Sequence, residues 1–143
     1  MKRLALDLGA RRIGVSLHDD DDVPARPAGT IEVTPGAAPI EAMAALIARE
    51  SPDEVIIGLP LNMDGSAGPA AKGAQRIAKA LEKKVTARVV LWDERLTTTQ
   101  AQRARIARGT KGRAGIDAEA ATILLQSYVD ARRGGSGWDP DAQ

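Results

Sequence analysis

Acidic residues that follow apolar segments are the side chains of this 143-residue chain best suited to chemistry. Asp7 stands near the end of the apolar segment Leu4–Leu8 and just before Gly9. A carboxylate on a buried strand is costly unless it has a partner. A metal ion is one such partner, and a phosphate bound over residues 9–12 would be a further contact. The alternative is a hairpin-turn aspartate that accepts hydrogen bonds from its own backbone.

Two further acidic sites occur at comparable places. Asp93 and Glu94 directly follow the apolar segment Val89–Trp92, and Asp117 precedes a helical pattern. If the three sites meet at one sheet edge, their carboxylates must repel one another or bind cations. Oxygen ligands of this kind suit Mg²⁺ or Mn²⁺. Two such ions about 4 Å apart could activate water and stabilise the leaving oxygen of a phosphodiester. Taken alone, Asp117 is more simply interpreted as a helix N-cap.

The run of acidic residues after the second apolar segment and the one histidine are weaker candidates for chemistry. The run Asp19–Asp22 is expected to be a charged, exposed turn rather than a metal site. The one histidine, His18, stands beside this run and is expected at the surface, so the chemistry needs no histidine base.

Basic residues gather just before Asp117. Five cations and no acidic residue occur over positions 103–113, in a stretch interrupted by glycines. Its position beside the candidate metal site indicates contacts with phosphates, which orient a nucleic acid without reading its sequence. The predicted nucleic-acid contacts are Arg11, Arg12, Arg103, Arg105, Arg108, Lys111 and Arg113.

The elements that must position these residues follow from hydrophobic spacing. Three strands come first and form an antiparallel meander, and β-α-β units with parallel pairing follow. The pattern predicts an α/β fold with a mixed five-stranded sheet and helices on both faces, with a ligand crevice at the carboxyl ends of the strands. The predicted strands are 4–8, 13–17, 29–33, 55–58 and 89–92, and the predicted helices are 40–50, 70–83, 99–107 and 117–132.

Composition limits the function classes. The length fits one domain, which we place at 1–132, with a glycine-rich flexible tail at 133–143. Cysteine is absent, so disulfides and thiolate metal sites are excluded. No signal peptide or apolar run long enough to span a bilayer is found, which predicts a cytoplasmic protein and no membrane partner. The net charge of +1 gives no argument for nucleic-acid binding, and the three aromatic residues are too few for base stacking.

Four sequence blocks in order along the chain resemble the YqgF/RuvX family. That family is described as Holliday-junction resolvases and is linked to pre-16S rRNA processing. The resemblance covers nearly the whole chain up to about Arg132. The blocks are Leu6–Val15, Ile57–Gly65, Trp92–Thr98 and Ile116–Tyr128.

The resemblance implies an RNase H-like fold and divalent-metal nuclease chemistry on structured nucleic acid. It places the catalytic and metal-binding acids at Asp7, Glu94 and Asp117, which leaves Asp93 a structural role, pairing with Arg95 or accepting backbone N–H bonds. One departure is that the segment ending at Gly58 has no carboxylate where many such nucleases carry a glutamate.

Asp64, in the loop that follows that segment, is a candidate substitute for the missing carboxylate. A second departure is Ala10, which stands where a threonine is common in the family.

Two other functions remain as alternatives. Residues 7–10 are similar to the first phosphate loop of sugar kinases and actin-like ATPases, but those enzymes close two domains around ATP and this length supplies one. A non-catalytic RNase H-like module that only binds nucleic acid is the second alternative. A homodimer is one assembly that the sequence leaves open.

Overall fold

The computed structural model describes residues 1–34, 39–96 and 112–133, with side chains from residue 117 onward in the last segment. No helix in these segments is long and apolar enough to cross a membrane. The described elements are β1 (Arg3–Leu8), β2 (Arg12–His18), β3 (Arg26–Glu32), α1 (Ile40–Glu50), β4 (Glu54–Leu59), α2 (Pro69–Glu82), β5 (Arg88–Asp93), the 3-10 turn η1 (Glu94–Leu96) and α4 (Gly112–Arg133).

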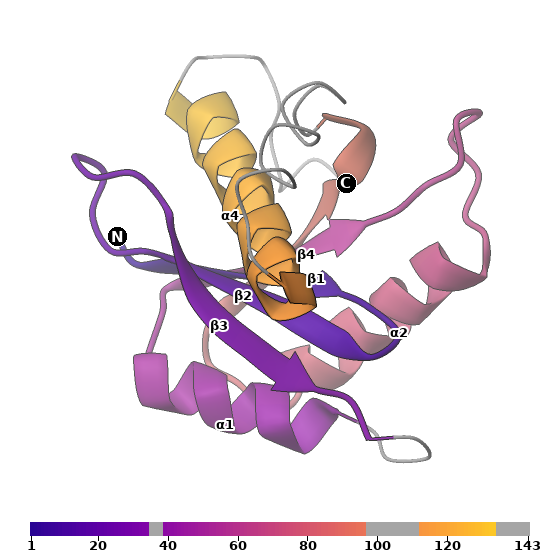
Figure 1. The fold of residues 1–143 in the computed structure, drawn as a ribbon, viewed down its shortest axis with the longest axis horizontal. Coiled ribbons are helices and arrows are strands. Elements are labelled where there is room, and N and C mark those ends of the chain that lie inside the picture. The colour runs from indigo at the N-terminus through magenta and orange to yellow at the C-terminus, as the bar shows by residue number, and fades with distance from the viewer. Residues whose placement is uncertain (35–38, 97–111, 134–143) are drawn as a thin grey trace.

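The five strands form one mixed sheet in the order β3-β2-β1-β4-β5. β2 pairs antiparallel with both β1 and β3, whereas β4 pairs parallel with both β1 and β5. Helices α1 and α2 cover one face of the sheet and α4 crosses the other (Figure 1). This arrangement confirms the predicted mixed sheet with helices on both faces. The predicted helix 99–107 lies outside the described residues, as do residues 134–143 of the predicted tail 133–143, whereas Arg133 belongs to α4.

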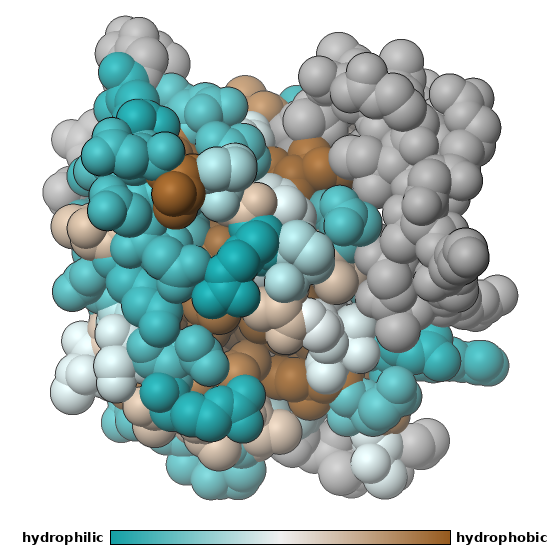
Figure 2. Space-filling model, turned by 60° about the vertical axis from the view of Figure 1, so that its left-hand side comes forward, coloured by the Kyte–Doolittle hydropathy of each residue, from teal (hydrophilic) through white to brown (hydrophobic). Residues whose placement is uncertain are grey.

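Alternation along β1 divides the interior into two cores. Leu4 and Leu6 point into the larger core, which is filled from the other side by α1 and α2. Ala5 points into the second core, which lies under α4 and includes Trp92 and Tyr128. Because side chains alternate between the faces of a strand, Asp7 projects on the same side as Ala5, toward α4. Hydrophilic side chains predominate on the outer surface in the view of Figure 2, with smaller apolar areas between them.

Two helix boundaries follow directly from local sequence. α1 begins and ends where the periodicity predicts and stops at Ser51, which adopts a left-handed conformation with φ 49° before Pro52. α2 starts with Pro69 in its first turn, a position where the fixed φ of proline suits a helix.

The start of α4 corrects the sequence prediction. The helix begins at Gly112, so Asp117 lies within it and does not cap it. The predicted start at residue 117 excluded Gly112 and Gly115, because glycine is a poor helix former. Packing of the helix against the sheet outweighs this local preference.

His18 is a second correction. It is completely buried rather than exposed, because it ends β2 on the face covered by α4 and pairs across the sheet with Arg3. Neither ring nitrogen has a hydrogen-bond partner within the described part of the chain. Burial lowers the pKa of His18, and the positive charge of Arg3 adds to the effect, while Asp21 opposes it. The ring is therefore held in its neutral form.

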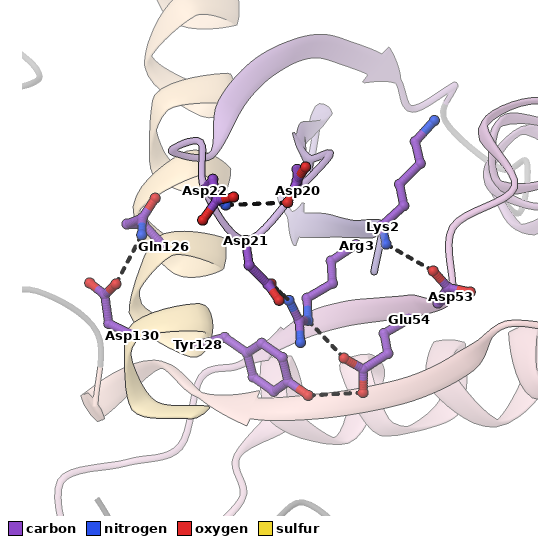
Figure 3. Close-up of polar contacts among 10 residues, drawn as sticks. All are labelled: Lys2, Arg3, Asp20, Asp21, Asp22, Asp53, Glu54, Gln126, Tyr128 and Asp130. Atoms are coloured by element: carbon purple, nitrogen blue, oxygen red, sulfur yellow. Dashed lines mark hydrogen bonds and ion pairs between the residues drawn. The ribbon is translucent and has the colours of Figure 1, made fainter. Parts of the chain in front are cut away.

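Arg3, the cross-strand neighbour of His18, belongs to a buried ion pair that Figure 3 shows. Nε of Arg3 donates to Oε1 of Glu54 at 2.8 Å, and the hydroxyl of Tyr128 donates to Oε2 of Glu54 at 3.1 Å. Burial raises the pKa of Tyr128 to about 12, so the hydroxyl keeps its proton at neutral pH. The acidic run is exposed as predicted, and Asp21 within it contacts Arg3 at 3.3 Å.

The lowered pKa of His18 predicts a loss of stability in mild acid. The unfolded state takes up a proton near the ordinary pKa of 6.5, whereas the folded state resists it. The free energy of unfolding should therefore fall as the pH drops from 7.5 to 5.5, with a limiting slope of about 1.4 kcal/mol per pH unit. Denaturant titrations of wild type and His18→Leu at several pH values measure this slope. The same slope in both proteins would contradict the assignment.

Candidate active site

Asp7 lies between two glycines in the sheet. It pairs directly with Gly14 of β2, and the parallel register that ends at Leu6 and Ile57 places Gly58 of β4 on its other side. Asp7 itself is half-buried and stands within β1, one residue before the strand ends, and not in the turn that follows. Because neither neighbour has a side chain, the sheet itself leaves the space on both sides of this carboxylate unfilled.

Helix α4 occupies the space beside Asp7 on β2. A Cβ atom on Gly14 would overlap the backbone carbonyl oxygen of Asp117, so the two backbones are in direct contact. One turn further along the helix, the hydroxyl of Ser16 donates to the carbonyl oxygen of Ala121 at 2.8 Å. Asp117 is thereby held over the strand next to Asp7.

The side chain of Glu94 occupies the space on β4. β5 ends at Asp93, and η1 turns the chain so that Oε1 of Glu94 lies where a Cβ of Gly58 would be. The last residue of η1 is tied to α4, since the hydroxyl of Ser127 donates to the carbonyl oxygen of Leu96 at 3.1 Å. The carboxyl end of β4, which has no carboxylate of its own, thus receives one from the end of the neighbouring strand.

Asp93 makes both contacts that the sequence predicts for it, with the side chain of Arg95 and with a backbone N–H of the turn. Its carboxylate accepts from the backbone N–H of Arg95 at 2.9 Å and from Nη2 of the same residue at 2.8 Å. These hydrogen bonds lower the pKa of Asp93. The pair fixes the turn that carries Glu94.

Arg95 also reaches the loop between β4 and α2. Its Nη1 donates to the carbonyl oxygen of Met63 at 3.3 Å. Asp64, the one acid of that loop, is exposed and accepts from the N–H of Ser66 at 2.9 Å and from its hydroxyl at 2.6 Å. These two bonds lower the pKa of Asp64 and close the turn around Gly65, whose φ is 88°. Asp64 is therefore engaged within its own loop.

The predicted phosphate contacts are only partly described. Arg11 is exposed, and Nε of Arg12 binds Glu32 at 3.1 Å. Arg113 belongs to the first turn of α4, and its side chain is not described. Arg103, Arg105, Arg108 and Lys111 lie outside the described residues.

The three predicted acids share one face and one edge of the sheet without closing around one point. No set of three Asp, Glu, His or Cys side chains in the described residues is close enough to hold a single ion. Mg²⁺ commonly takes only one or two protein carboxylates and completes its shell with water and substrate phosphates. The arrangement of Asp7 beside Glu94 fits that kind of site.

A sequence profile described as "RuvX: Holliday junction resolvase" matches residues 1–131. The chain belongs to the RuvX family. It is 38% identical over 138 residues to a Geobacillus kaustophilus protein named "Putative pre-16S rRNA nuclease", an alignment that covers 93% of this chain and 100% of that one. A Chloroflexus aurantiacus protein of the same name is 41% identical over 133 residues, with 91% and 87% covered.

Solved structures confirm the RuvC-like RNase H fold. Thermus thermophilus RuvC in complex with a Holliday junction matches this RuvX-family protein with a TM-score of 0.62 and 17% identity, covering 94% of this chain and 96% of that one. The fowlpox virus resolvase with its Holliday junction DNA matches with a TM-score of 0.62 and 13% identity, covering 92% and 99%. At these identities the likeness establishes the fold alone.

Sequence reasoning missed the part played by Gly14 and Gly58. A glycine inside an apolar strand signals close approach of another backbone or ligand, and both residues carry that signal. Which segment approaches them depends on residues 36 and 103 positions further along the chain, which a local pattern does not show. The link from Arg95 to Met63 likewise joins two distant loops.

The contact at Gly14 predicts that two glycine-to-alanine substitutions change the free energy of unfolding in opposite directions. Gly14→Ala must push α4 away from β2 and should lower the free energy of unfolding by about 1–3 kcal/mol or more. Gly73→Ala is the control, because its Cβ in α2 would meet only Nη2 of Arg76 at 3.8 Å. Removing a helical glycine should raise stability by about 0.5–1 kcal/mol. Equal effects in denaturant titrations would contradict the packing described.

Substitutions at Asp93 and Glu94 should affect stability and cleavage differently. Asp93→Asn should cost roughly 1–3 kcal/mol of stability at neutral pH and leave residual cleavage. Because the pKa of Asp93 is lowered, its contribution is complete above the ordinary value of 3.8 and disappears as the pH falls through the folded value. Glu94→Gln should keep the melting temperature within a few degrees and abolish cleavage. The reverse pattern would show that the two roles are exchanged.

Proposed function

We propose that this protein is a divalent-metal-dependent nuclease that hydrolyses phosphodiester bonds in structured nucleic acid. Asp7, Glu94 and Asp117 are its catalytic and metal-binding acids. The observation that carries the proposal is the pair of glycines beside Asp7, whose missing side chains leave room for Glu94 on one side and for α4 on the other. Membership of the RuvX family supports it.

The donor set fits a hard cation. Carboxylate oxygens are what Mg²⁺ and Mn²⁺ prefer, and neighbouring strands about 4.8 Å apart place Asp7 close to the carboxylate over Gly58. When bound, two ions of this kind supply an activated water and stabilise charge on the leaving oxygen. The residues of the chain orient the acids, and the Asp93–Arg95 pair holds the turn on which Glu94 stands.

Structured nucleic acid is the substrate class that agrees with both descriptions of the family. The relatives are named for pre-16S rRNA, and the family profile is named for Holliday junctions. Arg11 and Arg12, which follow β1, supply positive charge near Asp7. With the basic residues at 103–113 they would contact phosphates, so that shape rather than base sequence selects the substrate.

Cleavage assays test the proposal. A four-way DNA junction, a single-stranded RNA and a pre-16S rRNA fragment are each incubated with Mg²⁺ or Mn²⁺. At least one should be cut to leave a 5′-phosphate. Asp7→Asn should lose activity by orders of magnitude and still bind, because one charged ligand is removed. Asp64→Asn is the matched control and should keep its activity, since its carboxylate serves its own loop.

Two results would overturn the proposal. Full activity in EDTA would exclude a required metal, and full activity of Asp7→Asn would exclude this site. Tight binding with no cleavage under either metal would favour the alternative of a non-catalytic binding module.

A further inference from the structure

Helix α2 carries a stripe of four cations on its outer face, which we call the α2 stripe. Its members are Lys72, Arg76 and Lys79 of α2 and Lys83, the residue that caps the helix C-terminus, all exposed and spaced by four, three and four residues. This spacing puts them along one side of a helix. No described residue forms an ion pair or a hydrogen bond with any of the four side chains.

The α2 stripe is not what helix stability alone would favour. Like charges four residues apart repel, and the stripe contains two such pairs, Lys72 with Arg76 and Lys79 with Lys83. The first turn has no acidic residue, and Lys72 lies near the helix N-terminus, where the helix dipole disfavours a cation. A solvated helix of ordinary composition would place glutamates at some of these positions.

The neighbouring helix is arranged differently. Both glutamates of α1 are paired, Glu41 with Lys84 at 2.7 Å and Glu50 with Lys2 at 3.3 Å. Both acids of α1 are thus neutralised by other cations, and Glu82, the one acid of α2, forms no ion pair with any described cation. The positive charge of the α2 stripe is left for an external anion.

The stripe lies on the face of the sheet opposite α4 and is joined through the preceding loop to the carboxyl end of β4. α2 directly follows the loop 60–68, which projects from the end of β4 in Figure 1, and Arg95 ties this loop to the turn that carries Glu94. From Lys72 to Lys83 the helix rises about 16 Å at 1.5 Å per residue. That length matches roughly five nucleotides at 3.4 Å per step of one strand.

We propose that the α2 stripe binds the phosphate backbone of a substrate arm that extends past the cleavage point. The proposal rests on the proposed function in that the arm belongs to the same nucleic acid. Nucleic acid is favoured over an anionic membrane because the exposed part of α2 offers only Pro69 and Ala70 as apolar contacts. Contacts of this kind add affinity and orientation without base specificity.

Salt-dependent binding tests the stripe. The test variant is Lys72→Gln, Arg76→Gln, Lys79→Gln and Lys83→Gln together. The control changes Lys2, Arg26, Arg49 and Lys84 to glutamine. It removes the same number of positive charges, but from residues that already have acidic partners. Affinity for a four-way DNA junction with long duplex arms is measured in EDTA by fluorescence anisotropy over a range of salt concentrations.

The test variant should reduce the slope of log affinity against log salt by about 0.9 for each phosphate that the protein no longer neutralises. The control should change the slope much less, and on a junction with arms too short to reach α2 the two variants should bind alike. Equal slopes for test and control on long arms would overturn the proposal. So would stripe-dependent binding to phosphatidylserine vesicles with unaltered nucleic-acid binding.

The binding test separates this inference from the proposed function. Because binding is measured in EDTA, its outcome does not depend on cleavage, and the same measurement in an Asp7→Asn background should give the same difference between the variants. A protein that never cuts but shows the stripe effect would contradict only the nuclease. A nuclease without the stripe effect would contradict only the stripe.

Discussion

At Gly14 the carbonyl oxygen of Asp117 occupies the space that a Cβ atom would need, so α4 can cross β2 at this height only because the residue is glycine. The same crossing brings Asp117 beside Asp7 and buries the apolar face of α4 on the second core. Gly58 plays the matching part on the other side, where Glu94 fills the gap. The functional edge of the sheet is therefore shaped by two missing side chains as much as by the acids present.

A buried charge network holds the far end of α4. Tyr128 of the helix donates to Glu54, which also accepts from Arg3, and the guanidinium carbon of Arg3 lies 5.8 Å from the Tyr128 ring centroid. The ring of Trp92 meets that of Tyr128 edge-on at 5.7 Å. Breaking such a pair would leave an uncompensated buried charge, so the network resists displacement of the helix. α4 is thus fixed near Asp117 by close packing and near Tyr128 by directional polar contacts.

The sequence predicted what depends on local spacing. Alternating or continuous apolar residues located all five described strands, and the bounds of α1 were predicted to the residue. The burial of His18 was missed because its environment is made by Arg3 and by α4, both distant in sequence. The start of α4 was missed because packing on the sheet outweighs the poor helix propensity of glycine. The positions of the acids after apolar segments indicated a shared site. The close approach of α4 to Gly14 joins residues far apart in sequence, so it is visible only in the tertiary structure.

Direct measurement of cation binding tests the central claim, that Asp7 and its neighbours form one site. Titration of the protein with Mn²⁺, followed by the electron paramagnetic resonance signal of the free ion, gives the affinity without any cleavage. Asp7→Asn and Glu94→Gln should each weaken Mn²⁺ binding by at least an order of magnitude, whereas Asp64→Asn should not. Unchanged binding in Asp7→Asn, or equal losses in all three variants, would contradict it.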